Sequence, residues 1–324
     1  MRLNGAEIIV KLLERQGIAT IAGIPGGANL PLYNALYKSP IRHILARHEQ
    51  GAGFIAHGMA RSTGRPAVCF ATSGPGATNL ITAIADARLD SVPLIAITGQ
   101  VPTSMLGTDA FQEVDIYNMT IPITKHNFLV RSAAELLSVI PEAFEIALSG
   151  RPGPVLIDVP KDVQTQEIDV YGWPEIGERL PSPPIDTDAI ARAAAMINEA
   201  KRPVLYAGGG VMNSASHAVL REIAEKNSIP VALTLMGLGC FPPDNPLYLG
   251  MLGMHASPYT NLLLDEADLL IAVGARFDDR AVGRVQEFCP EAAIVHIDID
   301  RAELDKIRKA HISIACDAGE ALSA

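Results

Sequence analysis

The sequence contains few cysteines and no excess of basic residues, and these two absences exclude several classes of protein. The four cysteines lie far apart and form no C-x-x-C pair, so neither a disulfide framework nor a zinc site is expected. The 36 acidic residues outnumber the 26 basic ones and give a net charge of -10. Because no cluster of lysine and arginine could follow a phosphate backbone, nucleic acid is not an expected partner.

Long hydrophobic runs and an export signal are also missing. The longest apolar stretches, such as residues 267–273, have the length of a strand and fall far short of the ~20 residues that a membrane helix needs. The first residues, from Met1 to Gly5, run directly into an amphipathic pattern, without the apolar segment and cleavage site of a signal peptide. Together with the few cysteines, these absences predict a soluble cytoplasmic protein with no membrane partner.

The sequence does contain a repeated alternation of short apolar runs and helix-length amphipathic segments. With 324 residues, 48% of them hydrophobic, the chain is long enough for two domains. Asn4 and Glu7 have the spacing of a capping box, ahead of a first helix that ends at Gly17. The apolar runs that follow occupy residues 18–24, 41–46, 67–71, 94–98 and 155–159. This βαβ rhythm predicts an α/β fold with a parallel sheet covered on both faces.

A proline-rich polar segment divides the chain. Four prolines between residues 174 and 184 lie among polar and acidic residues, which is typical of a linker. We therefore place the first domain at residues 1–163, the linker at 164–188 and a second α/β domain at 189–324. Within the second domain we expect helices at residues 189–200 and 215–226, and strands at 204–207, 231–235, 269–273 and 294–297, followed by an apolar run at 312–315.

An acidic residue directly follows one of the apolar strands, in the segment Arg47-His48-Glu49-Gln50-Gly51-Ala52. In parallel sheets ligands bind at the carboxyl ends of the strands, so Glu49 stands where a site is expected. One interpretation is a carboxylate stabilised by the dipole at the start of a helix. The other is a buried acid with a raised pKa, held ready for proton transfer. The residues alone leave both interpretations open.

Glycine-rich loops follow strands in both domains. In the first domain these are residues 23–28 and 72–79, where glycines allow left-handed turns and the close approach of a ligand, although an ordinary turn explains the same letters. In the second domain, residues 207–211 suggest a nucleotide-binding turn. They do not match G-x-G-x-x-G, so a site for a nicotinamide cofactor is not supported. A site for FAD or another nucleotide is still an open alternative. Arg276 could simply form a surface ion pair with a nearby aspartate.

Taken together, the ordered motifs resemble the catalytic subunit of the acetolactate (acetohydroxyacid) synthases, which are thiamine-diphosphate enzymes. The resemblance extends over essentially the whole chain. It implies a pyrimidine-binding domain followed by a Rossmann-like middle domain, each a parallel α/β sandwich. The motifs that carry it begin at Asn4, Ile24, Arg47, Thr72, Asp109, Gly150, Pro160, Met251, Gly274 and His296.

The family also has a third domain, in which a Gly-Asp-Gly motif and a later asparagine hold Mg²⁺ and the cofactor's diphosphate. No Gly-Asp-Gly occurs in these residues. We therefore expect this chain to lack the diphosphate-binding domain, to contain no metal ligand and to be inactive alone.

In the first domain, the resemblance implies residues that bind and activate thiamine diphosphate. Glu49 matches the acid that hydrogen-bonds the aminopyrimidine ring and promotes loss of the thiazolium proton. Gly27 would offer its backbone N–H to a developing oxyanion, and Gln112 would approach the same centre. For His48 a packing role is favoured. Further contacts with the cofactor are expected from Pro25, Gly26, Ser73, Gly74 and Asn79.

The resemblance also implies residues for the substrate and for FAD, which has no redox role in the main reaction of this family. Arg276 resembles the residue that receives the carboxylate of the second 2-keto acid, a task that suits a planar guanidinium. The other substrate-binding residues would be Pro102, Phe111, Lys161 and Met251. The FAD contacts would be Arg151, Gly208, Gly209, Gly210, His255, Gly274, Arg276, Asp278, Arg280, Asp298 and Asp317.

The activity that the resemblance implies is decarboxylation of pyruvate and condensation with pyruvate or 2-ketobutyrate, in branched-chain amino-acid biosynthesis. Homodimers or tetramers, with or without a small regulatory subunit, are the implied assemblies. Two alternatives stay open. One is a truncated chain that does not catalyse, and the other is a glyoxylate carboligase, whose pattern has an apolar residue at the Glu49 position. Glu49 and Lys161 together favour the synthase.

Overall fold

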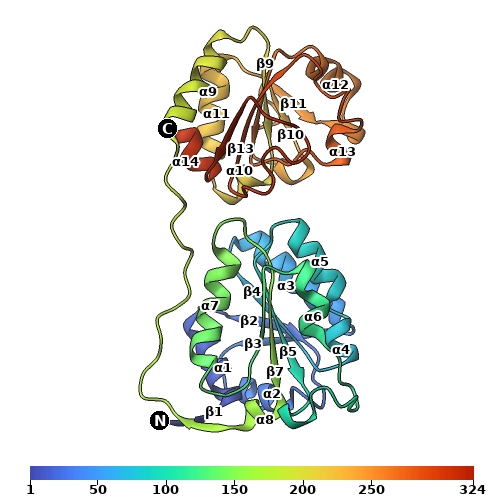
Figure 1. Cartoon of the computed structure of the whole chain (residues 1–324), viewed down its shortest axis with the longest axis vertical. Helices are drawn as coiled ribbons and strands as arrows, with labels where there is room; N and C mark the ends of the chain where they lie inside the picture. The colour runs from blue at the N-terminus through green and yellow to red at the C-terminus, as the bar shows by residue number, and fades with distance from the viewer. The chain divides into compact units, whose positions relative to one another are not determined.

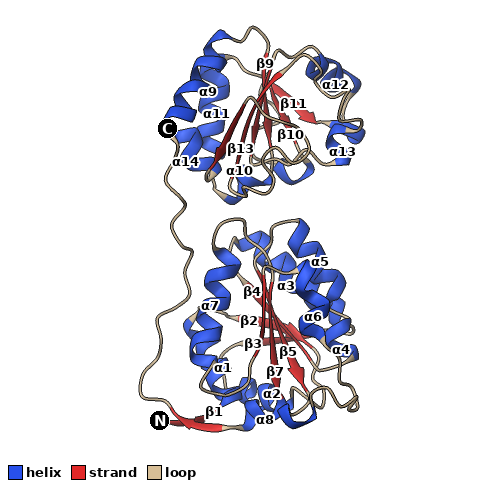
Figure 2. Cartoon of the chain, in the orientation of Figure 1, coloured by secondary structure: helices blue, strands red, loops and turns tan.

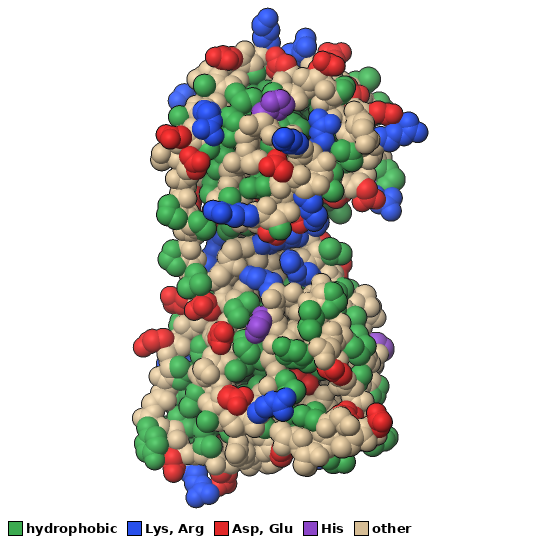
Figure 3. Space-filling model, viewed as in Figure 1, with side chains coloured by type: hydrophobic (Ala, Val, Ile, Leu, Met, Phe, Trp, Pro, Cys, Tyr) green, Lys and Arg blue, Asp and Glu red, His purple; other side chains and the backbone are tan.

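The computed structural model describes residues 1–324, which form two compact units, Met1–Pro181 and Ser182–Ala324 (Figure 1). Each unit is a six-stranded parallel sheet with helices on both faces (Figure 2). The predicted α/β fold of two parallel-sheet sandwiches is thereby confirmed. No helix combines the length and the apolar character needed to cross a bilayer. On the face drawn in Figure 3, acidic, basic and hydrophobic side chains are mixed over the surface of each unit.

The sheet of the first unit has the strand order β3-β2-β4-β5-β7-β6. The strands β4, β5 and β7 in its middle are buried along their whole length, as expected for a sheet covered on both faces. The bounds are β2 Thr20–Gly23, β3 Arg42–Leu45, β4 Ala67–Ala71, β5 Leu94–Gln100, β6 His126–Leu129 and β7 Val155–Pro160.

Helices on the two faces of this sheet bury alternate residues of the strands. On β4, Val68 and Phe70 join the core under α1, α2 and α7, whereas Cys69 and Ala71 join the core under α3 and α5. The helices are α1 Gly5–Arg15, α2 Leu30–Tyr37, α3 Glu49–Thr63, α4 Pro75–Thr78, α5 Ile81–Leu89, α6 Ile116–Thr120, α7 Leu136–Leu148 and α8 Lys161–Thr165, with 3₁₀ turns at Thr103–Met105 and Ile121–Ile123.

The predicted capping box at the first helix is present. The side chain of Asn4 accepts a hydrogen bond from the Glu7 N–H at 2.9 Å, and the Glu7 carboxylate accepts one from the Asn4 N–H at 3.0 Å. Two of the N–H groups that a helix start leaves unpaired are thus satisfied, which fixes where α1 begins.

The first part of the predicted linker belongs to the first unit. Strand β8 (Glu167–Asp169) pairs antiparallel with β1 (Arg2–Asn4), and Trp173 packs against the core of this unit. Gln164 is buried and donates hydrogen bonds to the carbonyls of Ala28 and Val159 at 2.8 Å each. A linker beginning at residue 164 is therefore placed too early, because these hydrogen bonds and apolar contacts hold residues 164–173 on the first unit.

The second unit repeats the architecture with the strand order β11-β10-β9-β12-β13-β14. The predicted strands of this domain are all present, and β11, which the sequence analysis does not predict, is added at one edge. The strands are β9 Pro203–Ala207, β10 Val231–Leu233, β11 Tyr248–Met251, β12 Leu269–Val273, β13 Ala293–Asp298 and β14 Ile312–Ala315. The helices are α9 Thr187–Glu199, α10 Gly209–Asn213, α11 His217–Asn227, α12 Pro258–Asp265, α13 Asp279–Val282 and α14 Ala318–Ser323, with 3₁₀ turns η3 Leu235–Gly237 and η4 Gly253–His255.

Candidate functional site

Glu49 is the first residue of α3 and lies at the carboxyl edge of the first sheet, just after β3. Its carboxylate accepts a hydrogen bond from the side-chain amide of Asn79 at 2.9 Å. Glu49 is half-buried, and a Cβ added at Gly76 would lie 3.3 Å from its Oε1, so the glycine lets the carboxylate approach the backbone closely. His48 caps the helix by accepting the Gln50 N–H at 3.2 Å, which is a local structural role.

The loop after β2 is held against the loop after β4. The Ala28 N–H donates to the Thr72 hydroxyl at 3.2 Å, and the Gly26 N–H donates to the side chain of Asn29 at 2.7 Å. A side chain at Gly26 would place its Cβ 2.6 Å from the Thr72 side chain, so glycine is required there for packing. Gly27, by contrast, is exposed and faces open space, which leaves its backbone accessible to a ligand.

Gln112 contacts the same group of loops. Gly74 has a φ of +58°, and a Cβ at this position would lie 2.6 Å from the Gln112 carbonyl, so the loop 107–115 touches the loop 72–79. The carboxylate of Glu113 accepts backbone N–H groups from Gly107, Thr108 and Ala110. These hydrogen bonds, led by the one from Gly107, lower the pKa of Glu113, and they give the Gln112 loop a defined shape.

The structure therefore brings the loops that carry the predicted catalytic residues to one edge of the first sheet. Glu49 and Asn79 are in direct contact, and Gly74 contacts Gln112. The remaining predicted residues of this edge differ in exposure: Ser73 is buried, Gly26 and Pro102 are half-buried, and Pro25 and Phe111 are exposed. At 87% exposure, Phe111 has nearly its whole ring free for a ligand or another chain.

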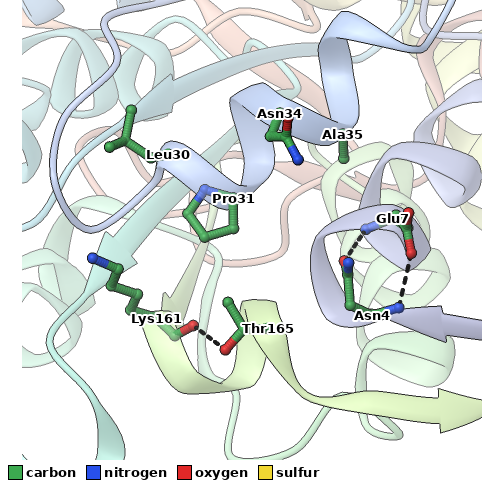
Figure 4. Close-up of a pocket in the computed structure, with 8 residues that line it drawn as sticks. All are labelled: Asn4, Glu7, Leu30, Pro31, Asn34, Ala35, Lys161 and Thr165. Atoms are coloured by element: carbon green, nitrogen blue, oxygen red, sulfur yellow. Dashed lines mark hydrogen bonds between the residues drawn. The ribbon is translucent and has the colours of Figure 1, made fainter.

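Lys161 lies at the start of α8 and lines a cavity of about 350 Å³ between α1, α2 and α8 (Figure 4). The cavity wall also includes the capping pair Asn4 and Glu7, so its two charged groups are the Glu7 carboxylate, which accepts the Asn4 N–H, and the Lys161 ammonium. Of the predicted site residues, Lys161 alone lines this cavity. The other lining residues are Leu30, Pro31, Asn34, Ala35 and Thr165.

A buried carboxyl group that the sequence analysis misses lies beneath the Gln112 loop. Asp158 on β7 is 1% exposed and accepts hydrogen bonds from the Thr98 hydroxyl at 2.7 Å and the Gln100 amide at 2.9 Å. The Gln100 amide also donates to the Val114 carbonyl at 2.9 Å, which connects the strands to the loop. Burial raises the pKa of Asp158 to about 7. The only sequence signal was an aspartate inside an apolar strand.

The glycines after β9 in the second unit serve close packing of backbone. A Cβ at Gly208 would lie 2.3 Å from the Gly274 carbonyl, and one at Gly210 would lie 2.5 Å from the Gly274 Cα. The N–H groups of Gly208 and Gly210 already donate to the carbonyls of Val273 and Gly274. The interpretation of these glycines as a phosphate-binding turn is thus weakened, because two of the N–H groups that such a turn needs are occupied.

The loop after β12 carries Arg276 at the carboxyl edge of the second sheet. Asp278 caps α13 by accepting the N–H groups of Arg280 and Ala281, and Asp279 pairs with Arg280 at 3.7 Å. Both aspartates are therefore engaged elsewhere, and no ion pair includes Arg276. The surface ion pair considered for Arg276 is absent, and its guanidinium remains available for an anion.

Most residues predicted to contact FAD gather at this edge. His255 lies in the η4 turn, where a Cβ at Gly253 would lie 2.2 Å from the Arg280 carbonyl. The predicted substrate residue Met251 ends the adjoining strand β11. Asp298 ends β13, and Asp317 caps α14 just after β14. Arg151 is the exception, since it lies in the first unit before β7, at the sheet edge opposite Glu49. There it donates to the Ser91 hydroxyl at 2.8 Å and the Leu89 carbonyl at 3.2 Å.

Known families and relatives match both units. The family model "Thiamine pyrophosphate enzyme, N-terminal TPP binding domain" matches residues 3–119, and "Thiamine pyrophosphate enzyme, central domain" matches residues 190–324. The acetolactate synthase isozyme 1 large subunit of Escherichia coli is 62% identical over 99% of this chain and 57% of its own length. The acetolactate synthase large subunit of Corynebacterium glutamicum is 52% identical over 99% of this chain and 52% of its own length.

Plant relatives are nearly as similar. The chloroplastic acetolactate synthase of Arabidopsis thaliana is 51% identical over 98% of this chain and 48% of its own length. The chain thus spans about half the length of the relatives that it matches.

Proposed function

Because this chain belongs to the thiamine pyrophosphate enzymes, we propose that it supplies the activating and substrate-selecting domains of an acetolactate synthase large subunit. The reaction is thiamine-diphosphate-dependent decarboxylation of pyruvate followed by condensation with pyruvate or 2-ketobutyrate. The observation that carries the proposal is the Glu49 carboxylate, which is held by Asn79 at the carboxyl edge of a sheet that matches the cofactor-binding domain of this family.

The residues at this edge fit the pyrimidine end of thiamine diphosphate. The carboxylate of Glu49 lies close to the backbone of Gly76, and the space beside Gly27 is open, so both loops offer polar groups that a flat polar ring would need. When bound, thiamine diphosphate would supply a carbon nucleophile for the keto group of the substrate. Glu49 would hold and move the proton at a ring nitrogen of the cofactor. The Gly27 N–H and the Gln112 side chain would stabilise negative charge on the substrate oxygen.

The second unit would select the second substrate and hold FAD without redox chemistry. The support for FAD is the gathering of His255, Gly274, Asp298 and Asp317 at one sheet edge, together with the free guanidinium of Arg276. Arg151 and the Gly208–Gly210 turn are less well supported as FAD contacts, because their donors are engaged within the protein. Mg²⁺ would be held by a diphosphate-binding domain. Self-association and a small regulatory subunit are part of the same proposal.

Activity should appear only when a diphosphate-binding domain completes the cofactor site. We expect this chain alone, given pyruvate, thiamine diphosphate and Mg²⁺, to form no acetolactate, because no Gly-Asp-Gly motif that could hold Mg²⁺ and the diphosphate occurs in these residues. Adding a diphosphate-binding domain, fused or as a separate chain, should give acetolactate in a colorimetric assay, and that domain alone is the control. Acetolactate formation by the isolated chain would overturn the proposal that a separate diphosphate-binding domain is required for activity.

Replacing Arg276 with glutamine should weaken use of the second 2-keto acid. Hydrogen bonds to a charged group contribute about 1.5–3 kcal/mol, so we expect roughly a 10- to 100-fold rise in the KM of that acid. The measurement is the ratio of products formed from mixtures of pyruvate and 2-ketobutyrate. Arg284→Gln, which removes an exposed arginine paired with Glu287 in the same unit, is the control. An unchanged KM and product ratio would remove Arg276 from this role.

A further inference from the structure

The backbone on either side of Arg276 is held by two buried side chains. The Tyr206 hydroxyl donates to the Arg276 carbonyl at 2.7 Å, and the His296 ring nitrogen Nε2 lies 3.0 Å from the Ala275 carbonyl. Since a carbonyl can only accept, Nε2 carries the hydrogen. Tyr206 lies on β9 and His296 on β13, the two strands that flank β12. The loop after β12 is therefore hydrogen-bonded from both sides where it leaves the sheet.

Phe277 completes this grip. Its ring lies edge-on to Tyr206, with centroids 5.7 Å apart, and edge-on to His296, with centroids 5.1 Å apart. Such arrangements are favourable between aromatic rings. Ala275 and Phe277 are both buried, whereas Arg276 between them is half-buried. We call Tyr206, Phe277 and His296 the ring clamp, since together they fix the backbone from which only the Arg276 side chain extends.

His296 belongs to this clamp although its second nitrogen has no partner. The ring is fully buried, and Nδ1 makes no hydrogen bond. A buried polar atom without a partner is destabilising, and an apolar side chain of similar size would avoid that cost. Burial also lowers the pKa of His296 and raises that of Tyr206, which favours the neutral form of both side chains. The hydrogen bond from the imidazole to the Ala275 carbonyl offsets this cost.

The guanidinium of Arg276 is free while its backbone is fixed. Asp278 is used in capping α13, and Asp279 pairs with Arg280. A cation held in place without a counter-ion is ready to bind an anion, and a misplacement of about 1 Å in such a group has large effects on substrate use. We propose that Tyr206 and His296 are positioning residues that place Arg276 and thereby determine selectivity for the second 2-keto acid. This inference rests on the proposed role of Arg276.

Tyr206→Phe removes the hydroxyl and keeps the ring, so it tests the hydrogen bond itself. In the enzyme completed with a diphosphate-binding domain, we expect a 3- to 10-fold rise in the KM for the second acid and a changed product ratio, with kcat for pyruvate within twofold of the parent. Thr260→Val is the matched control, because Thr260 is buried in the same unit and its hydroxyl donates to the Leu249 carbonyl at 2.6 Å. Thr260→Val should lower stability to an extent similar to Tyr206→Phe and leave the selectivity for the second acid unchanged.

The histidine variants keep the test informative if Tyr206→Phe folds poorly. His296→Gln can place an amide N–H near the position of Nε2 and should retain selectivity, whereas His296→Leu should lose it. In an Arg276→Gln background, Tyr206→Phe should add no further loss, since both changes act on one interaction. If Arg276→Gln changes selectivity but Tyr206→Phe and His296→Leu behave like Thr260→Val, the ring clamp is only structural. If Arg276→Gln itself has no effect, the proposed role of Arg276 fails instead.

Discussion

Replacing Glu49 with glutamine should lower turnover of the completed enzyme by roughly 10²- to 10⁴-fold, the range that general acid–base catalysis contributes. Glutamine has the shape of glutamate and its oxygen can still accept the hydrogen bond from Asn79, which is 2.9 Å long in the parent. It cannot take up or release a proton. The loss should therefore appear in a proton-transfer step and leave folding unchanged.

The decisive measurement is the rate at which bound thiamine diphosphate exchanges its C2 proton for deuterium. It should fall with turnover in Glu49→Gln, while the affinity for the cofactor changes little. Asn79→Ala is the matched comparison, because it removes the partner of the carboxylate and keeps the carboxylate itself. We expect a loss of about tenfold or less there, in line with a single side-chain hydrogen bond. Exchange at the parent rate in Glu49→Gln would exclude Glu49 as the proton-transfer group.

Much of the fold could be predicted from the sequence because central parallel strands are continuous apolar runs. Strands β4, β5 and β7 are buried along their whole length, and each was expected at its place. The sequence analysis omits the short pair β1 and β8 and, in the two large sheets, β6 and β11. Both β6 and β11 lie at sheet edges and mix buried with partly exposed residues. Without neighbours on both sides, an edge strand needs no continuous apolar pattern, so its sequence carries little signal.

The site was less accessible to prediction, because its contacts join residues far apart in the chain. The family resemblance assigned Glu49, Asn79 and Gln112 to the site. The short sequence segments around these residues are equally typical of ordinary turns. Packing explains why these loops contain glycine. A side chain at Gly26 would clash with Thr72, and one at Gly74 would clash with Gln112. Neither requirement can be read from the glycine alone.

Asp158 illustrates the same limit and leads to the second large effect. Its partner Thr98 lies 60 residues earlier, and the apolar strand around Asp158 predicts a sheet position without indicating a partner. Desolvation raises its pKa to about 7, even though hydrogen bonds from Thr98 and Gln100 act in the opposite direction. The folded chain therefore binds the proton of Asp158 more tightly than the unfolded chain, where the pKa is near 3.8.

The sign of the pH dependence follows from this difference. Below the unfolded pKa both states are protonated, and the stabilising contribution of Asp158 is fully present. As the pH rises through about 7 the folded state must ionise the buried carboxyl group, so the contribution is lost. A shift of about three pKa units corresponds to roughly 4 kcal/mol, which we take as an upper limit. Unfolding free energy should thus decrease between pH 4 and pH 8 through this group.

Asp158→Asn isolates the effect, because asparagine reproduces the hydrogen-bond pattern of the protonated acid. Its oxygen can accept from Gln100 while its amide donates to the Thr98 hydroxyl, and neither depends on pH. Trp173, the only tryptophan, packs against the core of the first unit, so its fluorescence during urea unfolding reports on that unit. The stability of the parent relative to Asp158→Asn should fall as the pH rises from 4 to 8, by up to about 4 kcal/mol. A difference that stays constant over this range would mean that Asp158 is already ionised in the folded chain, and that Thr98 and Gln100 outweigh its desolvation.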